Sequence, residues 1–231
     1  MTPAPTLIAR YRHSTGVSYG RLDAEVWRRL DAAPWEGGRP TGAVDERSAV
    51  TLLAPVTPTK IVCVGLNYPA HKAESATVVP TSVEAGEPLL FLKPPSAVIA
   101  TGDAIRYPAG VTRLDPEGEL AVVIGRRARA VTAEAALDHV AGLTCVNDVS
   151  ARNYQRQDGQ WARAKGFDTF APLGPWIAIG LDPHGLTVEC RVNGELRQRG
   201  NTADLTFTVP FLISFISRIM TLEPGDVIAT G

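Results

Sequence analysis

The chain has 231 residues, of which 45% are hydrophobic and 20% are charged, the balance of an ordinary globular protein. This length allows one large domain, or one domain with a small appended lobe. The formal net charge of −1 argues against a nucleic-acid groove or a surface for anionic membranes. No apolar run reaches the roughly 20 residues that a membrane span needs. The first residues lack a charged region followed by an apolar one, so we expect no signal peptide and a cytoplasmic protein.

Residues 1–55 mix short apolar stretches with a Gly/Pro-rich patch and predict a small N-terminal lobe. Residues 56–231, which begin with a Pro-containing linker, predict one larger domain. Strands outnumber helices in this part, which indicates a β-rich α+β fold. Strands are predicted at 60–65, 89–92, 119–124, 143–148 and 227–229, a hairpin turn at Asn193-Gly194, a helix entry at Tyr68-Pro69, a loop at 75–88, and helices at 132–140 and 211–220.

Three cysteines, Cys63, Cys145 and Cys190, lie in apolar, strand-like stretches. Their number is odd and their spacings are unrelated, which does not fit a disulfide framework or a zinc motif. We therefore expect buried, reduced thiols at all three positions.

Two glutamates, Glu117 and Glu119, stand at the start of an apolar run that reads as a strand. Residues i and i+2 of a strand point to the same face, so both carboxylates should lie beside Ala121 and Val123. Two like charges so close repel each other unless a cation lies between them or one is protonated. The pair therefore predicts a metal site.

Asp148 is the third acidic candidate, at the end of the next predicted strand. Three carboxylates without a nearby histidine or cysteine form a hard, all-oxygen site that suits Mg²⁺ or Mn²⁺ better than Ca²⁺. The alternative is that Glu117 and Glu119 are exposed charges at a strand edge and that Asp148 caps a turn.

Two further sets of residues could contribute to catalysis. Lys165 lies between aromatic residues and could stabilise an enolate or bind a carboxylate, although a surface lysine is the simpler interpretation. His71 and Glu74 are three residues apart and would share one face of a helix after Pro69. The carboxylate would then make the imidazole a better general base, and the alternative is an incidental surface pair.

A series of motifs follows in order from about Lys60 to Gly231. These are Val64-Gly-Leu-Asn-Tyr68 with His71 and Glu74, Phe91-Leu-Lys-Pro-Pro95, Glu117-Gly-Glu119-Leu-Ala-Val-Val-Ile-Gly125, Asn147-Asp-Val-Ser-Ala-Arg152, Trp161, Ala164-Lys-Gly-Phe-Asp-Thr-Phe170, Leu173-Gly-Pro-Trp176, Val192-Asn-Gly194, Gln198 and Leu222-Glu-Pro-Gly-Asp226. Together they resemble the fumarylacetoacetate hydrolase superfamily, in particular its branch of acylpyruvases, oxaloacetate decarboxylases and hydroxyhepta-diene-dioate isomerases. They do not specify the substrate.

The resemblance implies a mixed β-sandwich or roll, with the catalytic domain at 56–231, and assembly as a homodimer. It implies that Glu117, Glu119 and Asp148 hold one Mg²⁺ or Mn²⁺, and that Lys165 is an active-site residue. His71 and Glu74 are then the dyad that activates water on a lid. The family pattern usually continues beyond Ala229-Thr-Gly231 with Thr-Pro and a glycine-rich stretch, so we expect the printed sequence to be part of a longer chain. Pro69-Ala70 also departs from many members, although the dyad spacing is kept.

The activity implied by the resemblance is hydrolysis of a carbon–carbon bond in a 2,4-diketo acid through a metal-bound enolate. Decarboxylation of oxaloacetate and isomerisation of a hydroxy-dienedioate pass through the same enolate, so the ligand set does not separate the three reactions. A catalytically silent family member that only binds metal is an alternative of another class. The expected partner is a small 2-oxo or diketo acid, with no nucleic acid and no membrane.

Overall fold

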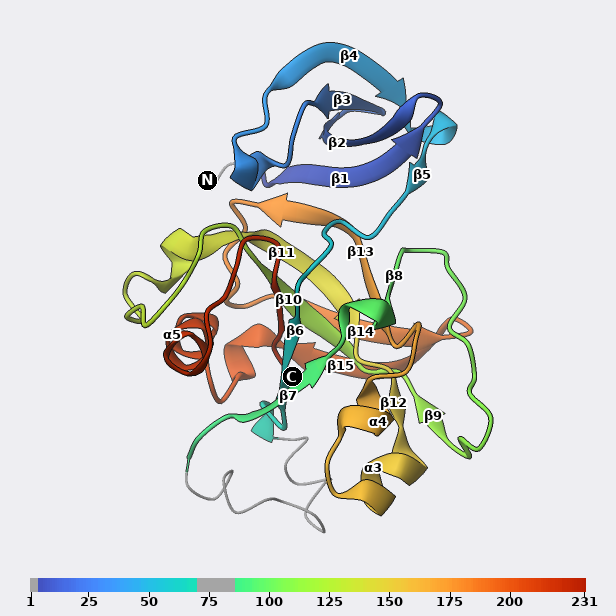
Figure 1. Ribbon diagram of the computed structural model, residues 1–231, viewed down its shortest axis with the longest axis vertical. Coiled ribbons are helices and arrows are strands. Elements are labelled where there is room, and N and C mark those ends of the chain that lie inside the picture. The colour runs from blue at the N-terminus through green and yellow to red at the C-terminus, as the bar shows by residue number, and fades with distance from the viewer. Residues whose placement is uncertain (1–3, 70–85) are drawn as a thin grey trace.

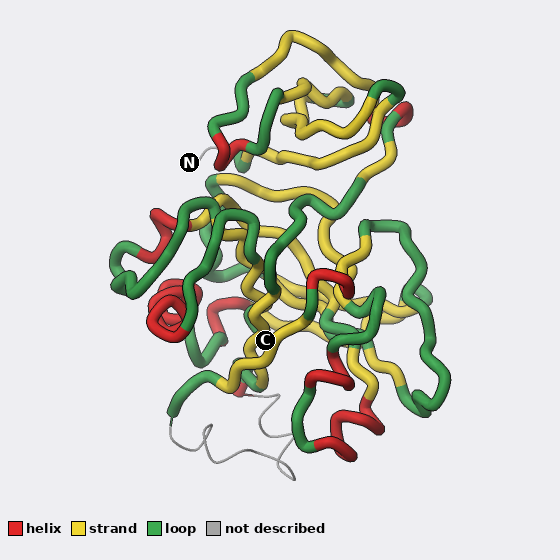
Figure 2. The backbone as a smooth tube through the Cα atoms, viewed as in Figure 1, coloured by secondary structure: helices red, strands yellow, loops and turns green. Residues whose placement is uncertain are grey.

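A computed structural model of the protein describes residues 4–69 and 86–231. Within these residues, 12 strands form one mixed sheet that runs through the molecule (Figure 1). The main path of the sheet is, in spatial order, β4 (Pro40–Glu46), β3 (Val26–Leu30), β2 (Gly16–Asp23), β1 (Thr6–His13), β13 (Ala171–Ile179), β11 (Val140–Asn147), β10 (Gly118–Ile124), β16 (Val227–Ala229), β6 (Ile61–Gly65) and β7 (Leu89–Lys93). Strands and loops dominate, and helices lie at the periphery (Figure 2). The predicted β-rich α+β class is confirmed.

The N-terminal strands form an antiparallel meander at the top of Figure 1. They continue the main sheet because β1 pairs with β13, with Thr6 opposite Ile179. A short strand, β5 (Thr51–Leu52), pairs with the other end of β1. Tyr11 and Trp27 are buried inside this part, and Gly20 leaves room for the phenol ring, since a Cβ there would lie 2.7 Å from Tyr11.

The central strands are apolar on both faces because each face is covered. On one face, Leu120, Val122 and Ile124 of β10 pack with the buried side of helix α5 (Val209–Ile219). On the other face, Ala121 and Val123 pack with residues of β6, β13 and β16. Strand periodicity places Glu119 on this second face, as the sequence predicts.

The remaining elements surround the central strands. They are β8 (Val98–Ile99), which pairs with β13; β9 (Leu114–Asp115) with β12 (Ser150–Ala151); helices α3 (Arg152–Asp158) and α4 (Ala162–Lys165); and the hairpin β14 (Thr187–Val192) and β15 (Glu195–Asn201). Single 3₁₀ turns occur at Pro34–Glu36, Arg47–Ala49, Pro95–Ala97, Ala136–His139 and Thr202–Asp204. The predicted hairpin turn is confirmed, with φ of 53° at Asn193 and 82° at Gly194. No helix in the described ranges is long and apolar enough to cross a membrane.

The predicted helix at 132–140 is wrong. Only the 3₁₀ turn Ala136–His139 forms, and β11 begins at Val140. The His139 carbonyl accepts hydrogen bonds from the amides of Gly125 (2.8 Å) and Arg126 (3.2 Å), and Val140 pairs with Ile124. The main-chain groups of His139 and Val140 therefore form hydrogen bonds within the sheet and cannot continue a helix.

The expectation of three buried thiols is also wrong in part. All three cysteines are free, but only Cys63 is buried, whereas Cys190 is half-buried and Cys145 is exposed. Cys145 lies opposite Leu120 and shares its face of the sheet. This face of the sheet is buried at Leu120 of β10 but exposed to solvent at Cys145 of β11. An apolar stretch of sequence therefore did not guarantee burial of the cysteine.

Candidate active site

The register of β10 and β11 brings the three predicted carboxylates together. Glu117 directly precedes β10 and Asp148 directly follows β11, and Gly118 lies opposite Asn147. The Asp148 amide donates a hydrogen bond to the Glu117 carbonyl at 2.8 Å, which closes this end of the pair. One carboxylate oxygen from each of Glu117, Glu119 and Asp148 lies within 4.8 Å of the other two. We call these three residues the acid cluster.

Lys165 also lies at the acid cluster. Its ammonium nitrogen is 2.5 Å from Glu117 Oε2 and 2.5 Å from Asp148 Oδ2. The side chain is 3% exposed, so the alternative of a solvated surface lysine is excluded. The rings of Phe91 and Trp161, which meet edge to face, lie 5.0 and 5.8 Å from the same nitrogen. Lys165 is therefore enclosed by two carboxylates and two aromatic rings.

Two further cations contact the cluster. Arg152 donates hydrogen bonds to Glu117 Oε1 and, at 2.9 Å, to Asp115 Oδ2. Ser150 Oγ donates to Glu117 Oε2 at 2.9 Å. Lys93 Nζ lies 2.7 Å from Asp148 Oδ1. Arg152, Ser150 and Lys93 were not predicted to be site residues, although all three belong to the motifs of the family resemblance.

The contact between Lys93 and Asp148 is electrostatic and is not a hydrogen bond. The Lys93 ammonium donates to the carbonyls of Val149 (3.1 Å), Lys165 (2.6 Å) and Phe170 (2.8 Å), which use its three protons. Asp148 Oδ1 is buried and accepts no hydrogen bond from the described part of the chain. One carboxylate oxygen of the acid cluster thus remains available as a ligand.

The two glutamates differ in their electrostatic environment. Burial alone would raise the pKa of Glu117, but Lys165 and Arg152 lower it to about 2. Burial, followed by the charges of Asp148 and Glu117, raises the pKa of Glu119 well above its usual value. Glu119 is 5% exposed, and it accepts a hydrogen bond from the Gly231 amide at 2.8 Å. No ion pair to a lysine or arginine forms at Glu119 among residues 4–69 and 86–231.

These observations fit a divalent cation. The donor set consists of carboxylate oxygens, which hard cations such as Mg²⁺ and Mn²⁺ prefer. The acid cluster contains a buried oxygen without a hydrogen bond and a buried carboxylate without a cationic partner in the described chain. A cation between the three side chains would relieve both.

Two of the predicted site residues, His71 and Glu74, lie outside the described residues, as does most of the predicted 75–88 loop. The chain that leads to them is fixed at Asn67, which is fully buried. Its side-chain nitrogen Nδ2 donates to the carbonyls of Thr230 (2.7 Å) and Phe207 (3.0 Å). Burial, and next the charge of Glu119, raises the pKa of Tyr68 to about 12. This segment therefore leaves the sheet close to Glu119.

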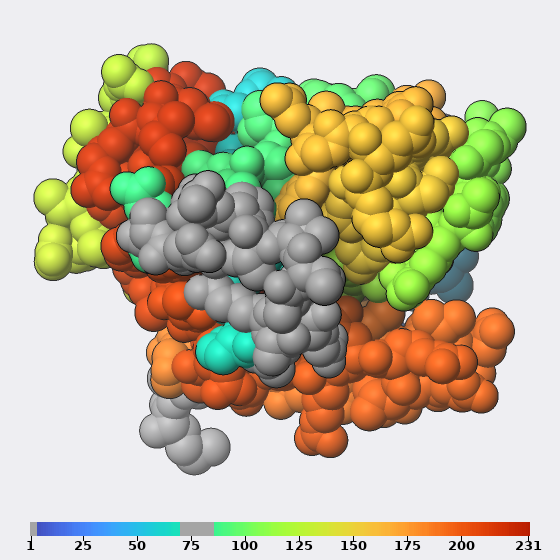
Figure 3. Space-filling model, turned by 90° about the horizontal axis from the view of Figure 1, so that it is seen from below, coloured from blue at the N-terminus to red at the C-terminus, as the bar shows by residue number. Residues whose placement is uncertain are grey.

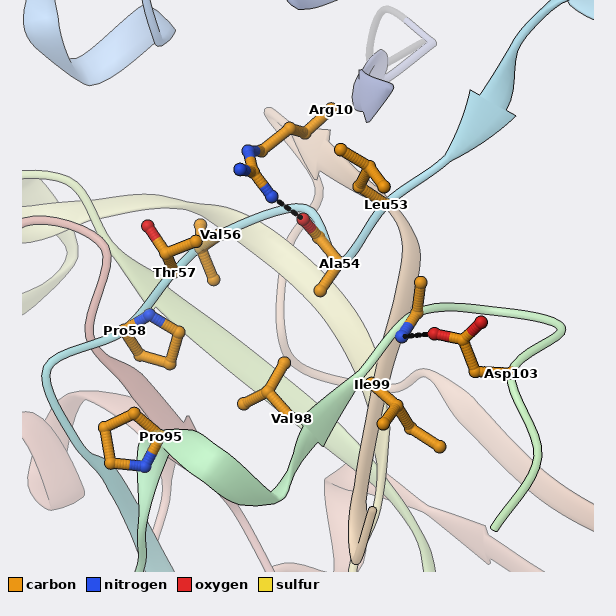
Figure 4. Close-up of a pocket in the computed structure, with 11 residues that line it drawn as sticks. Arg10, Leu53, Ala54, Val56, Thr57, Pro58, Pro95, Val98, Ile99 and Asp103 are labelled. Atoms are coloured by element: carbon orange, nitrogen blue, oxygen red, sulfur yellow. Dashed lines mark hydrogen bonds between the residues drawn. The ribbon is translucent and has the colours of Figure 1, made fainter. Parts of the chain in front are cut away.

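A separate groove lies between the linker after β5 and the segment around β8 (Figure 4). Its volume is about 290 Å³ and its walls are mainly apolar, with Arg10 and Asp103 at the rim. No residue of the acid cluster lines it. The groove is therefore not the site of the chemistry that the acid cluster suggests.

Comparisons with known proteins agree with this geometry. The model of the family described as fumarylacetoacetate (FAA) hydrolase C-terminal matches residues 60–231, and one described as Rv2993c-like, N-terminal, matches residues 7–55. The mitochondrial oxaloacetate tautomerase FAHD2B of Bos taurus is 48% identical over 80% of this chain and 59% of its own length.

Two solved structures are similar over nearly the whole chain. The 2-hydroxyhepta-2,4-diene-1,7-dioate isomerase from Mycobacterium marinum has a TM-score of 0.88 and 38% identity, covering 98% of this chain and 86% of its own. The maleylpyruvate hydrolase from Sphingobium sp. SYK-6, in complex with a manganese(II) ion and pyruvate, has a TM-score of 0.76 and 32% identity, covering 97% and 88%. The chain belongs to the fumarylacetoacetate hydrolase family, whose members include isomerases, hydrolases and tautomerases.

Proposed function

We propose that this chain is a divalent-metal-dependent enzyme that hydrolyses a carbon–carbon bond in a 2,4-diketo acid such as an acylpyruvate. The proposal rests on the acid cluster, in which Glu117, Glu119 and Asp148 bring three carboxylate oxygens within 4.8 Å of one another. These residues would hold Mg²⁺ or Mn²⁺. The ion would supply Lewis-acid polarisation of the substrate oxygens. The related maleylpyruvate hydrolase was solved with manganese and pyruvate, a 2-oxo acid.

The charge balance of the site supports an anionic substrate. The acid cluster has three carboxylates, and three cations, Lys93, Lys165 and Arg152, contact it at Glu117 and Asp148, so the positive charges equal the negative ones in number. The two positive charges of a bound divalent ion would then be uncompensated. A 2-oxo acid in its enolate form carries two negative charges, one on the carboxylate and one on the enolate oxygen. Substrate and site are therefore complementary in charge.

Lys165 is suited to electrostatic stabilisation and not to proton abstraction. Two carboxylates at 2.5 Å keep its nitrogen an ammonium, and burial strengthens its interaction with negative charge that develops on the substrate. The general base is instead assigned to His71, assisted by Glu74. His71 would remove a proton from the water that attacks the distal carbonyl, and this assignment is supported by the sequence spacing and the family resemblance.

A second candidate reaction is keto–enol tautomerisation of oxaloacetate. It is favoured by the 48% identity to the bovine oxaloacetate tautomerase. This reaction moves a proton between carbon and oxygen and needs no attacking water. The same charge balance would stabilise its enolate, so the acid cluster alone does not separate the two reactions.

The test is a spectrophotometric assay of a short acylpyruvate and of oxaloacetate with Mn²⁺, with Mg²⁺ and with EDTA. We expect cleavage of the acylpyruvate to pyruvate that requires the metal and that falls at least about a hundredfold in His71→Ala. Enolisation of oxaloacetate without cleavage of any diketo acid would favour the tautomerase. Full activity in EDTA would contradict the metal-dependent mechanism. Mn²⁺ binding without turnover of any substrate would indicate a silent family member.

A further inference from the structure

The β14–β15 hairpin contacts the chain between the two glutamates of the acid cluster. The side-chain amide of Gln198, on β15, forms two hydrogen bonds with the main chain of Gly118. Gln198 Oε1 accepts from the Gly118 amide at 2.9 Å, and Gln198 Nε2 donates to the Gly118 carbonyl at 2.8 Å. One side chain thus occupies both polar groups of the residue between Glu117 and Glu119.

A β-bulge directs Gln198 toward this position. Cys190 lies opposite Gln198 and Arg191 lies opposite Leu196, so Arg197 is an extra residue on β15. Without the bulge, Leu196 and Gln198 would share a face of the strand, because residues i and i+2 point the same way. With it, Gln198 shares a face with Cys190 and is half-buried, whereas Leu196 is 43% exposed. In Figure 3 the hairpin forms an orange ridge along one edge of the molecule.

The hairpin can approach this closely because residue 118 is a glycine. A Cβ at this position would lie 3.2 Å from the Cβ of Cys190. The neighbouring groups are fixed as well: the Glu117 amide donates to Asn147 Oδ1 at 2.9 Å, and the Glu117 carbonyl accepts from the Asp148 amide at 2.8 Å. All four polar main-chain groups of residues 117 and 118 are therefore bound. Gln198 provides two of the four partners.

We propose that Gln198 is a positioning residue that sets the affinity of the acid cluster for a divalent cation. The inference rests on the proposed metal site. Rotation of the Gly118 main chain would move the carboxylates of Glu117 and Glu119 relative to each other. Gln198 prevents this rotation and contributes no ligand atom itself. Such partners of ligand-bearing groups typically change metal affinity by about 10- to 100-fold when they are removed.

The test compares Mn²⁺ affinity, measured by electron paramagnetic resonance, in four proteins: wild type, Gln198→Met, Gln198→Glu and Arg199→Met. Methionine keeps the size and flexibility of glutamine and removes both hydrogen bonds. Glutamate keeps the acceptor for the Gly118 amide and loses the donor. Arg199 lies on the same strand, is exposed and pairs across the hairpin with Glu189 at 3.7 Å, so Arg199→Met is the matched control.

We expect the dissociation constant for Mn²⁺ to rise at least about tenfold in Gln198→Met, less in Gln198→Glu, and not in Arg199→Met. The spectrum of the bound ion should also change in both Gln198 variants. Unfolding temperatures in EDTA show whether each variant folds. If Gln198→Met does not fold, the Mn²⁺ affinity of Gln198→Glu alone decides the test. Wild-type affinity in a folded Gln198 variant would overturn the positioning role and leave the metal site intact. A wild-type protein that does not bind Mn²⁺ would overturn the metal site, and the positioning role with it.

Discussion

In the N-terminal strands, one carboxylate is matched by several donors, whereas in the acid cluster three carboxylates crowd together. Asp45 accepts two hydrogen bonds from Arg29, at 2.6 and 2.9 Å, and one from the Tyr11 phenol at 2.8 Å. The hydrogen bond from Arg29 lowers the pKa of Asp45 below its usual value, against the effect of burial. At Glu119, burial and the charges of the neighbouring carboxylates instead raise the pKa above its usual value.

The difference distinguishes a structural ionic network from the proposed metal site. Arg29 and Asp45 neutralise each other and complete each other's hydrogen bonds, so their network stabilises the fold without a ligand. The acid cluster leaves Glu119 without a cation in the described chain and Asp148 Oδ1 without a hydrogen bond. Such an arrangement costs stability in the free protein and is retained where a ligand uses it.

The largest expected effect is on catalysis and follows from Glu119→Gln. The amide is nearly isosteric but is a weaker ligand, so Mn²⁺ affinity and activity should fall, activity on the order of 10³-fold. The variant should unfold at a higher temperature than wild type in EDTA, because one of three crowded charges is gone. Glu195→Gln, an exposed position on β15, is the control and should leave Mn²⁺ affinity, activity and the unfolding temperature unchanged. Retained Mn²⁺ affinity in Glu119→Gln would remove Glu119 from the ligand set.

Asp45→Asn should lower stability and leave metal binding intact, the reverse of the result expected for Glu119→Gln. It leaves the guanidinium of Arg29, which is 23% exposed, without its counter-charge, and we expect a loss of about 2 kcal/mol in the free energy of unfolding. Mn²⁺ affinity should stay within about twofold of wild type, since no residue of the acid cluster contacts Asp45. Urea denaturation measures the loss, and Asp23→Asn, in an exposed pair with Arg28, should have a much smaller effect. Equal losses in both variants would show that the Tyr11–Arg29–Asp45 network adds nothing to an exposed ion pair.

The smallest expected effect is the pH dependence of these stability differences, measured in EDTA. The folded pKa of Asp45 is lowered, so its contribution is full above the unfolded value of about 3.9 and is lost as the pH falls through the folded pKa. The deficit of Asp45→Asn should therefore shrink below about pH 4. The folded pKa of Glu119 is raised, so wild type loses stability as the pH rises through it. The advantage of Glu119→Gln should grow toward neutral pH, and a deficit there would contradict the electrostatic account.

The acid cluster could be predicted because it depends on local geometry. Strand periodicity places Glu119 on the face of Ala121 and Val123, and the next strand returns Asp148 to the same end of the sheet. The hairpin at Asn193-Gly194 and the helix near 211–220 were predictable for the same reason: their signals lie within a few residues.

The features that were missed depend on distant segments. Lys93 precedes two prolines and reads as part of a turn, but its partners are carbonyls 56 to 77 residues away. The bulge that directs Gln198 has no sequence signal that we recognise. The helix expected at 132–140 fails because Gly125 and Arg126 bind the His139 carbonyl, a competition that periodicity within the segment does not show.

The three residues of β16 have a consequence for folding. This strand pairs antiparallel with β10 and parallel with β6, so it joins the half-sheet that bears the acid cluster to the half-sheet that bears Lys93. In the described chain, no other strand hydrogen-bonds to both halves. Both partners of β16 lie far from it in sequence, since Val227 lies opposite Val123 of β10 and Ile61 of β6. The two pairings that join the halves of the sheet are therefore non-local, and we expect the step that forms them to be slow compared with closure of the local hairpins.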